Sequence, residues 1–257
     1  MRAERMYHEM MSHVPILGHG RVKHVLIVGG SDLSLAAEVL RHRGVLSVVQ
    51  VHADPLAAKV PRSTTDGVNS AAFGGGRFRM HIADRSEFLA STRELFDLIL
   101  VDLPGHVDAR SARGCLMPGG VLIARLGSPF LQPLAFDAGI KRLSAVFSNV
   151  SAYLVSVPGV AGPVAIGWGS NASCPDSLER EMLAARFADA RIDTRYYSPE
   201  IHRASFALPR FIEQAVNAAI RAHEEDEDAH QAQQCHSARP TPESPRVPAR
   251  AGLLAPL

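Results

Sequence analysis

Hydrophobic runs and helical patterns alternate along the first half of this chain. Five short runs rich in Val, Ile and Leu are typical of strands covered on both faces of a sheet. These runs are residues 24–30, 45–51, 77–82, 96–102 and 119–126. The segments "LSLAAEVLRH", "PLAAKV" and "RSEFLAST" between them have helical spacing or composition. Alternation of strand and helix predicts right-handed crossovers and a doubly wound parallel sheet.

The second half adds a different edge to this sheet. Residues 133–147 have the pattern of a longer helix, and two apolar runs follow at 150–157 and 163–169. Only a short segment with Pro and Gly separates these two runs, which predicts an antiparallel hairpin. We therefore expect an α/β fold with a doubly wound, mostly parallel seven-stranded sheet. By analogy of fold, this is the class I methyltransferase (Rossmann-like) type with an antiparallel edge hairpin.

The chain changes character near its end. Helical patterns return at 176–190 and 206–221, and the last segment, 222–257, is first polar and charged and then rich in proline. Such a composition cannot bury enough apolar surface to order itself. We expect a Rossmann-like domain over 21–221, followed by a disordered tail.

Composition narrows the classes of function. The chain has 257 residues, 46% of them hydrophobic, and a formal net charge of +1. Near-neutral charge argues against nucleic-acid partners, and no apolar run approaches the roughly 20 residues that cross a bilayer. The first residues lack the apolar core of a signal peptide, so we expect a cytoplasmic protein. Cys115, Cys174 and Cys235 lie far apart, which predicts reduced thiols and no metal site.

Polar residues after the first strand are the first candidates for a site, because ligands of open parallel sheets bind at the carboxyl ends of strands. Gly29 and Gly30 let a ligand approach the backbone closely, and Asp32 stands beside them. The alternative role for Asp32 is a simple helix N-cap.

The second and third strands end on further polar residues. His52 can hydrogen-bond ribose hydroxyls, although it holds no fixed negative charge, and Asp54 is a candidate N-cap. Asp84 stands where an adenine amino group could be met. Its alternative role is an N-cap with Glu87 as capping-box partner, and the two roles are compatible.

After the fourth strand, Asp102 precedes a Pro-Gly turn. A carboxylate there could bind a cationic amine and take its proton, and the alternative is an aspartate that only forms the turn. Near the start, Tyr7, His8 and Glu9 lie among methionines. A surface helix explains these three residues adequately, so the pattern alone assigns them no role.

Several stretches together resemble bacterial spermidine synthases, the polyamine aminopropyltransferases. The resemblance runs from residue 7 to about residue 215, and it is carried by "YHEMMSHVPILGHGRVKHVLIVGGSDLSLAAEVLRH", "GGVLIAR", "SPFLQP" and above all "TRYYSPEIHRASFALPRF". It implies a methyltransferase-like sheet that transfers an aminopropyl group from decarboxylated S-adenosylmethionine, the co-substrate, to putrescine. The products would be spermidine and methylthioadenosine, and no prosthetic group or metal is implied.

The resemblance also implies roles for single residues. Asp102 corresponds to the general base, and residues 1–20 to a substrate-contacting helix with Tyr7 and His8 as a polyamine-contacting pair. Asp32 corresponds to the acid that meets the amine. The positions implied to bind the aminopropyl donor or methylthioadenosine are Gly29, Gly30, His52, Asp84 and Arg85.

The chain departs from the family pattern at several of these places. Leu33 and Ser34 replace glycines and are expected to crowd the ligand. His52 replaces a ribose-binding glutamate. Arg85 replaces a glycine, and Gly105 replaces a second acid. The loop that follows is shorter, a tyrosine is missing from "VPGVAGPV", and we expect the family's N-terminal β domain to be absent. Each lost charge-assisted hydrogen bond forfeits about 1.5–3 kcal/mol, roughly ten- to hundredfold in affinity.

Two interpretations therefore stay open. In the first, the chain is a spermidine synthase with Asp102 as base and Asp32 as amine anchor. In the second, it is a catalytically degenerate paralogue that binds nucleoside or polyamine, or regulates an intact synthase. The partners expected are a polyamine and a sulfonium nucleoside, with a homodimer or a heteromer with an intact synthase also open. A methyltransferase shares the fold but has no further support.

Overall fold

The computed structural model describes residues 3–30, 33–54, 73, 75–103, 108–159, 161–172, 175 and 178–222. The chain divides into two units, Met1–His223 and Glu224–Leu257. The second unit, and with it nearly all of the tail predicted over 222–257, lies outside the described residues. The predicted helix "PLAAKV" lies outside them as well.

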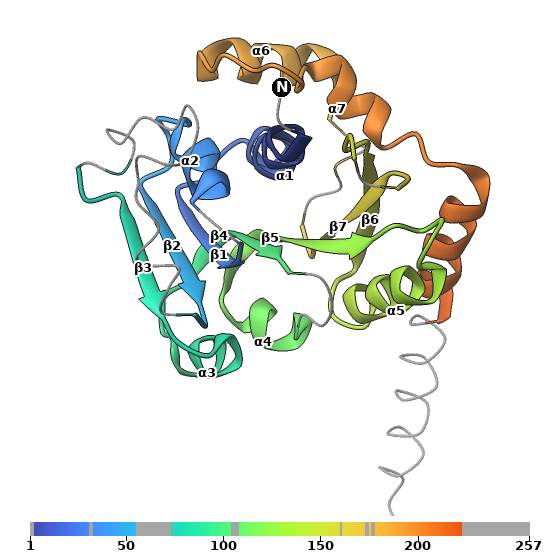
Figure 1. Ribbon diagram of the computed structural model, residues 1–257, viewed down its shortest axis with the longest axis horizontal. Helices are drawn as coiled ribbons and strands as arrows, with labels where there is room; N and C mark the ends of the chain where they lie inside the picture. The colour runs from blue at the N-terminus through green and yellow to red at the C-terminus, as the bar shows by residue number, and fades with distance from the viewer. Residues whose placement is uncertain are drawn as a thin grey trace, which may run out of the picture. The chain divides into compact units, whose positions relative to one another are not determined.

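A seven-stranded sheet forms the centre of the first unit, with strand order β3-β2-β1-β4-β5-β7-β6 (Figure 1). The strands are β1 (His24–Gly29), β2 (Ser47–His52), β3 (Phe78–Ile82), β4 (Phe96–Asp102), β5 (Leu116–Gly127), β6 (Asn149–Val155) and β7 (Val164–Ser170). β1 to β5 are parallel, and β7 runs antiparallel to both β5 and β6. The mostly parallel sheet with an antiparallel edge hairpin is confirmed.

Helices cover both faces of this sheet (Figure 1). One face carries α1 (Ala3–His19), α2 (Ser34–Leu40), α6 (Arg180–Ala190) and α7 (Pro199–Ser205). The other carries α3 (Arg85–Ser91), α4 (Ala109–Gly114) and α5 (Pro133–Ser144), and helical residues 210–222 pack beside α5. α4 and α7 were not predicted from the sequence, and the helix expected from residue 206 begins at 210.

Alternating side chains of each strand enter two separate cores. Val25 and Ile27 of β1 pack under α1 and α2, whereas Leu26 and Val28 face the layer of α3, α4 and α5. Burial on both faces explains why the strands are almost continuously apolar in the sequence. No helix among the described residues is both long and apolar enough to span a lipid bilayer.

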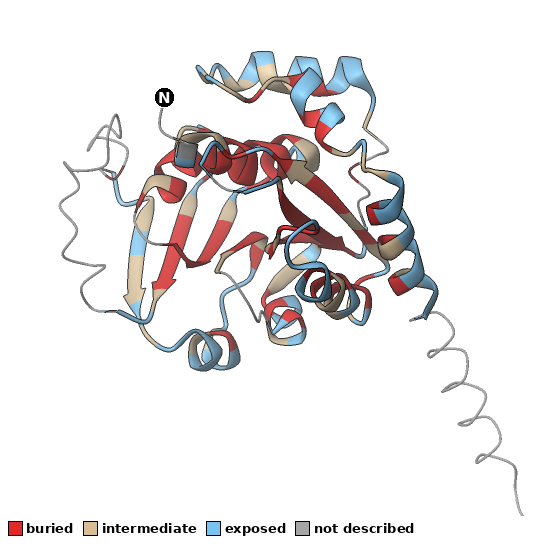
Figure 2. Ribbon diagram, turned by 45° about the vertical axis from the view of Figure 1, so that its right-hand side comes forward, coloured by how far each residue is buried: buried red, intermediate tan, exposed pale blue. Residues whose placement is uncertain are grey.

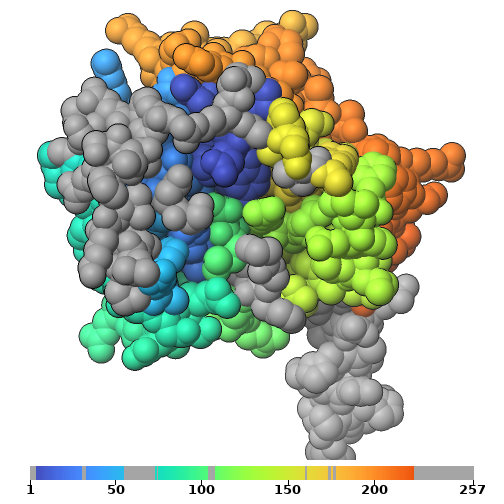
Figure 3. Space-filling model, viewed as in Figure 1, coloured from blue at the N-terminus to red at the C-terminus, as the bar shows by residue number. Residues whose placement is uncertain are grey.

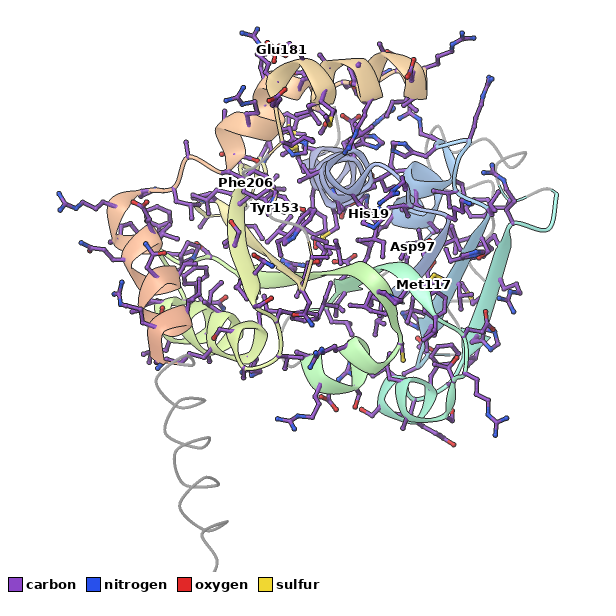
Figure 4. All side chains as sticks on the ribbon, turned by 180° about the vertical axis from the view of Figure 1, so that it is seen from behind. His19, Asp97, Met117, Tyr153, Glu181 and Phe206 are labelled. Atoms are coloured by element: carbon purple, nitrogen blue, oxygen red, sulfur yellow. The ribbon has the colours of Figure 1, made fainter. Side chains whose placement is uncertain are left out.

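The expectation of a surface helix near the start is wrong. α1 is largely buried, as Figure 2 shows, and Tyr7, His8 and Glu9 are 7%, 9% and 0% exposed. The helix lies across the sheet under α6, so polar side chains that suggested solvent exposure have partners inside the protein. The sheet also holds the helix directly, since the Tyr153 hydroxyl of β6 donates to the Met10 carbonyl at 3.2 Å. Tyr153 packs in turn on Phe206, with ring centroids 5.1 Å apart (Figure 4).

Glu9 anchors α1 to the segment before α7. Its carboxylate accepts the backbone N–H groups of Arg195, Tyr196 and Tyr197 at distances of 2.8 to 3.1 Å. The Arg5 guanidinium adds a contact of 3.3 Å from the same helix. Three backbone N–H groups thus depend on one buried carboxylate, which fixes the position of α1 over the sheet.

Replacing Glu9 tests this anchor. Glu9→Gln exchanges one acceptor oxygen for an NH₂ group that faces backbone donors, so we expect the free energy of unfolding to fall by about 3 kcal/mol in urea titrations. The matched control is Glu181→Gln on the exposed side of α6 (Figure 4), expected to change it by less than about 0.5 kcal/mol. Equal effects of the two variants would contradict the anchoring role of Glu9.

A buried polar chain joins α1 to α2. His13 Nδ1 lies 2.9 Å from His42 Nε2, and His13 Nε2 lies 3.4 Å from a Glu38 oxygen, which Arg41 also contacts at 2.7 Å. Burial would raise the pKa of Glu38, but hydrogen bonds from His13 and Arg41 outweigh it and lower the pKa to about 2. Burial, with the charges of His13 and Arg41, lowers the pKa of His42 to about 3.

The neutral state of His42 makes stability depend on pH. Its folded-state pKa lies below the ordinary value of 6.5, so the unfolded chain binds the extra proton and stability falls as the pH drops from about 6.5 toward 3. We expect His42→Gln to reduce this slope by about one proton, roughly 1.4 kcal/mol per pH unit. Urea unfolding between pH 7 and pH 4 measures it, and parallel curves for variant and wild type would contradict it.

Candidate functional site

The carboxyl ends of β3, β2, β1, β4 and β5 meet at one edge of the sheet. The parallel register pairs Gly29 with Asp102 and His52 with Ile82, and Asp84 lies two residues after the end of β3. In Figure 3, dark blue atoms from the start of the chain reach the surface beside green atoms from its middle part. The strand-end residues named from the sequence therefore share one edge, where α/β sheets bind ligands.

Asp102 and Tyr7 are in direct contact. The Tyr7 hydroxyl donates to Asp102 Oδ1 at 2.8 Å, which joins α1 to the end of β4. Burial raises the pKa of Tyr7 well above its usual value, and the charge and hydrogen bond of Asp102 add to the rise. The phenol therefore keeps its proton and acts as a donor, and Asp102 is the group of this pair that can accept a proton. Asp102 is more than a turn-forming residue.

Arg125 is a further charged residue at this place. It follows Ala124 of β5, the partner of Val101 in β4, and the strand alternation directs it to the α1 face, like Ile123. Its guanidinium carbon lies 5.5 Å from the centroid of the Tyr7 ring, within cation–π range. Arg125 was not predicted from the sequence, although a charged residue inside a buried strand is a signal that could have found it.

The two glycines after β1 shape the edge next to Asp102. Gly29 and Gly30 have φ values of +88° and +87°, and the Gly30 N–H donates to the Asp102 carbonyl at 3.1 Å. A Cβ on Gly29 would lie 2.4 Å from Leu103 Cγ and 2.9 Å from the Asp102 carbonyl oxygen. Glycine at position 29 is therefore required by the close approach of β4, and this packing sets the place of Asp102.

His52 is half-buried at the end of β2. Its Nδ1 accepts the backbone N–H of Asp54 at 3.0 Å. Nδ1 also lies 3.2 Å from the Asp54 carbonyl oxygen. In the tautomer whose Nδ1 accepts from Asp54, Nε2 carries the proton and can donate to a ligand oxygen. The resemblance implies a carboxylate at this position, whereas this chain has an imidazole without a fixed negative charge.

Asp84 is the N-cap of α3, which is one of the two roles expected from the sequence. Its Oδ1 accepts the backbone N–H groups of Ser86 at 2.8 Å and Glu87 at 3.1 Å. Both bonds use the same oxygen, so Oδ2 can accept from a ligand amino group. Arg85, the first residue of α3, is exposed next to it.

The remaining predicted residues divide into two groups. His8 is buried beside Tyr7, with ring centroids 5.6 Å apart, and Leu33 is 4% exposed in the core below α1. Asp32 and Gly105 lie outside the described residues. Among the residues that the structure does describe, no group of three or more His, Cys, Asp or Glu side chains is placed to hold a metal ion.

Comparison with known proteins gives this site a context. The spermine/spermidine synthase domain matches residues 4–171. The chain belongs to this family. A polyamine aminopropyltransferase of Klebsiella pneumoniae is 37% identical over 228 residues, 84% of this chain and 80% of the relative. One from Ruegeria sp. is 36% identical over 219 residues, 80% of this chain and 77% of the relative.

Solved structures of spermine/spermidine synthase family members share the fold. The spermidine synthase of Thermotoga maritima has a TM-score of 0.75 and 29% identity, covering 84% of this chain and 75% of the other. A spermidine synthase in complex with the transition-state analogue AdoDATO has a TM-score of 0.74 and 28% identity, with the same coverage. The resemblance proposed from the sequence motifs is confirmed at the level of family and fold.

Gly29 offers a test of how this family member's site is built. We expect Gly29→Ala to lower the free energy of unfolding by about 2 kcal/mol, because alanine at positive φ is strained and its Cβ meets Leu103 and Asp102. Gly44→Ala is the control, since a Cβ there meets nothing within 4 Å, and its effect should stay within about 1 kcal/mol. Urea titration of both variants decides, and a Gly29→Ala chain as stable as Gly44→Ala would contradict the proposed packing.

Proposed function

We propose that this protein transfers an aminopropyl group from decarboxylated S-adenosylmethionine to an amine, with putrescine giving spermidine and methylthioadenosine. The observation that carries the proposal is the hydrogen bond from Tyr7 to Asp102 at the carboxyl edge of the sheet. It places an oriented carboxylate at the end of β4, and the chain belongs to a family with spermidine synthases of the same fold.

Asp102 acts as the general base in this proposal. The amine nitrogen attacks the methylene carbon next to the sulfonium, and Asp102 takes the proton that the nitrogen loses. A C–N bond forms while a C–S bond breaks, and its electron pair stays on sulfur as neutral methylthioadenosine. Because the sulfonium already activates the carbon, the site has to supply alignment and a deprotonated amine. Tyr7 orients the carboxylate and keeps its own proton.

The donor nucleoside would lie over the ends of β1, β2 and β3. Gly29 and Gly30 have no side chains, so the nucleoside can come close to the backbone there. His52 Nε2 can donate to a ribose oxygen, and Asp84 Oδ2 can accept from the adenine amino group. Arg85, exposed beside Asp84, can contact the outer side of the base. His8, and Asp32 in the amine subsite, stay predictions from the resemblance.

Asp102→Asn tests the proposal directly. The amide cannot take the proton, so we expect the rate of methylthioadenosine formation from decarboxylated S-adenosylmethionine and putrescine to fall about 10²- to 10⁴-fold. Tyr7→Phe leaves the carboxylate but removes its hydrogen bond, and a smaller loss of about tenfold is expected. Chromatography of the nucleoside product measures both.

The control for these variants is Asp189→Asn on the exposed side of α6, which should keep the wild-type rate. Circular dichroism of each variant shows whether it is folded. Absence of methylthioadenosine from the folded wild type at saturating substrates would overturn the proposed function, and an unchanged rate in Asp102→Asn would overturn the role of the base.

A second candidate is favoured by His52, which holds no fixed negative charge where the resemblance implies a ribose-binding carboxylate. If the ribose subsite has lost its acceptor, the chain is a catalytically degenerate paralogue that binds nucleoside or polyamine, or regulates an intact synthase. This candidate predicts stoichiometric association with an intact synthase in analytical ultracentrifugation. The first candidate needs no such partner, and a homodimer is compatible with it.

A further inference from the structure

Arg125 places a positive charge where the proposed reaction brings in a cationic amine. The residue lies on the α1 face of β5, one strand from Asp102, and it is half-buried. Neighbouring strands are about 4.8 Å apart, so both side chains project from one short stretch of the sheet edge. The mechanism proposed above uses Asp102 and Tyr7 and gives Arg125 no role.

No carboxylate within the described part of the chain pairs with Arg125. Its contact there is the Tyr7 ring, at 5.5 Å. Other partly buried arginines on this face of the sheet have partners, since Arg41 contacts Glu38 at 2.7 Å and Arg186 donates to two backbone carbonyls. A half-buried guanidinium without a paired carboxylate among the described residues has five N–H donors suited to a carboxylate.

The position of Arg125 bears on the acceptor rather than on the donor. In the proposed function the nucleoside occupies the ends of β1, β2 and β3, which leaves the ends of β4 and β5 for the amine. A diamine with one nitrogen at Asp102 would then extend its second, charged nitrogen toward the guanidinium. Like charges in a partly desolvated site repel, whereas a carboxylate at the same distance is attracted.

We propose that Arg125 binds a carboxylate of the acceptor, so that the preferred acceptor is a diamino acid and not a plain diamine. This inference rests on the proposed function and names the substrate class of the same site. The side-chain amine of the acceptor gives its proton to Asp102 and attacks the aminopropyl carbon, while the carboxylate forms charge-assisted hydrogen bonds with Arg125. A chain of three or four carbons spans the distance between neighbouring strands.

Ornithine and putrescine are the matched probes, because ornithine is putrescine with one added carboxylate. Calorimetric titration of the full chain, with methylthioadenosine present, measures the affinity for each amine. We expect the wild type to bind ornithine at least tenfold more tightly than putrescine. Arg125→Gln should remove this preference, and Arg125→Lys should keep part of it because the positive charge remains.

Arg203→Gln, on the exposed side of α7, is the control and should keep the wild-type ratio. Tighter binding of putrescine by the wild type would overturn the inference, as would a ratio unchanged in Arg125→Gln or the absence of binding by either amine. Turnover is measured separately with both amines. Tighter binding of ornithine without methylthioadenosine formation supports the role of Arg125 and refutes the proposed function. Aminopropyl transfer with putrescine as the preferred amine supports the proposed function and refutes the role of Arg125.

Discussion

The attachment of α1 to the segment before α7 is the interaction on which the candidate site depends. Glu9 collects three backbone N–H groups from residues 195–197, far along the chain, and holds the helix across the sheet. Tyr7 stands two residues earlier on the same helix, so its reach to Asp102 follows from this anchor. A carboxylate buried in this way is stable only when its hydrogen bonds are satisfied, which makes the arrangement all-or-none.

The electrostatics of this edge of the sheet depend on Tyr7, which α1 places beside Asp102. Tyr7 is buried and stays neutral, so it couples to Asp102 as a donor and to Arg125 through its ring. One carboxylate and one guanidinium thus lie on either side of an uncharged phenol. A site with both signs of charge is better matched to an acceptor with both signs than to a dication, which is the physical reason for proposing a carboxylated acceptor.

Local rules and topology accounted for much of this fold and part of the site. The apolar runs of β1 to β5 were found within a few residues, and the N-cap role of Asp84 followed from neighbouring residues. Asp102 was predicted because strands of a parallel sheet end at one edge. The burial of α1 was missed, since the partners of Glu9 lie more than 180 positions away in sequence. Arg125 was missed because its meaning depends on the contact with Tyr7 across elements.

We propose that this edge of the sheet binds the nucleoside of an aminopropyl donor. Calorimetric titration of the full chain with methylthioadenosine alone tests it most directly, with an intact spermidine synthase titrated alongside. We expect binding at one site with a micromolar Kd, on the order of 8 kcal/mol of binding free energy. A folded sample that gives no heat at millimolar ligand, while the intact synthase binds, would contradict it.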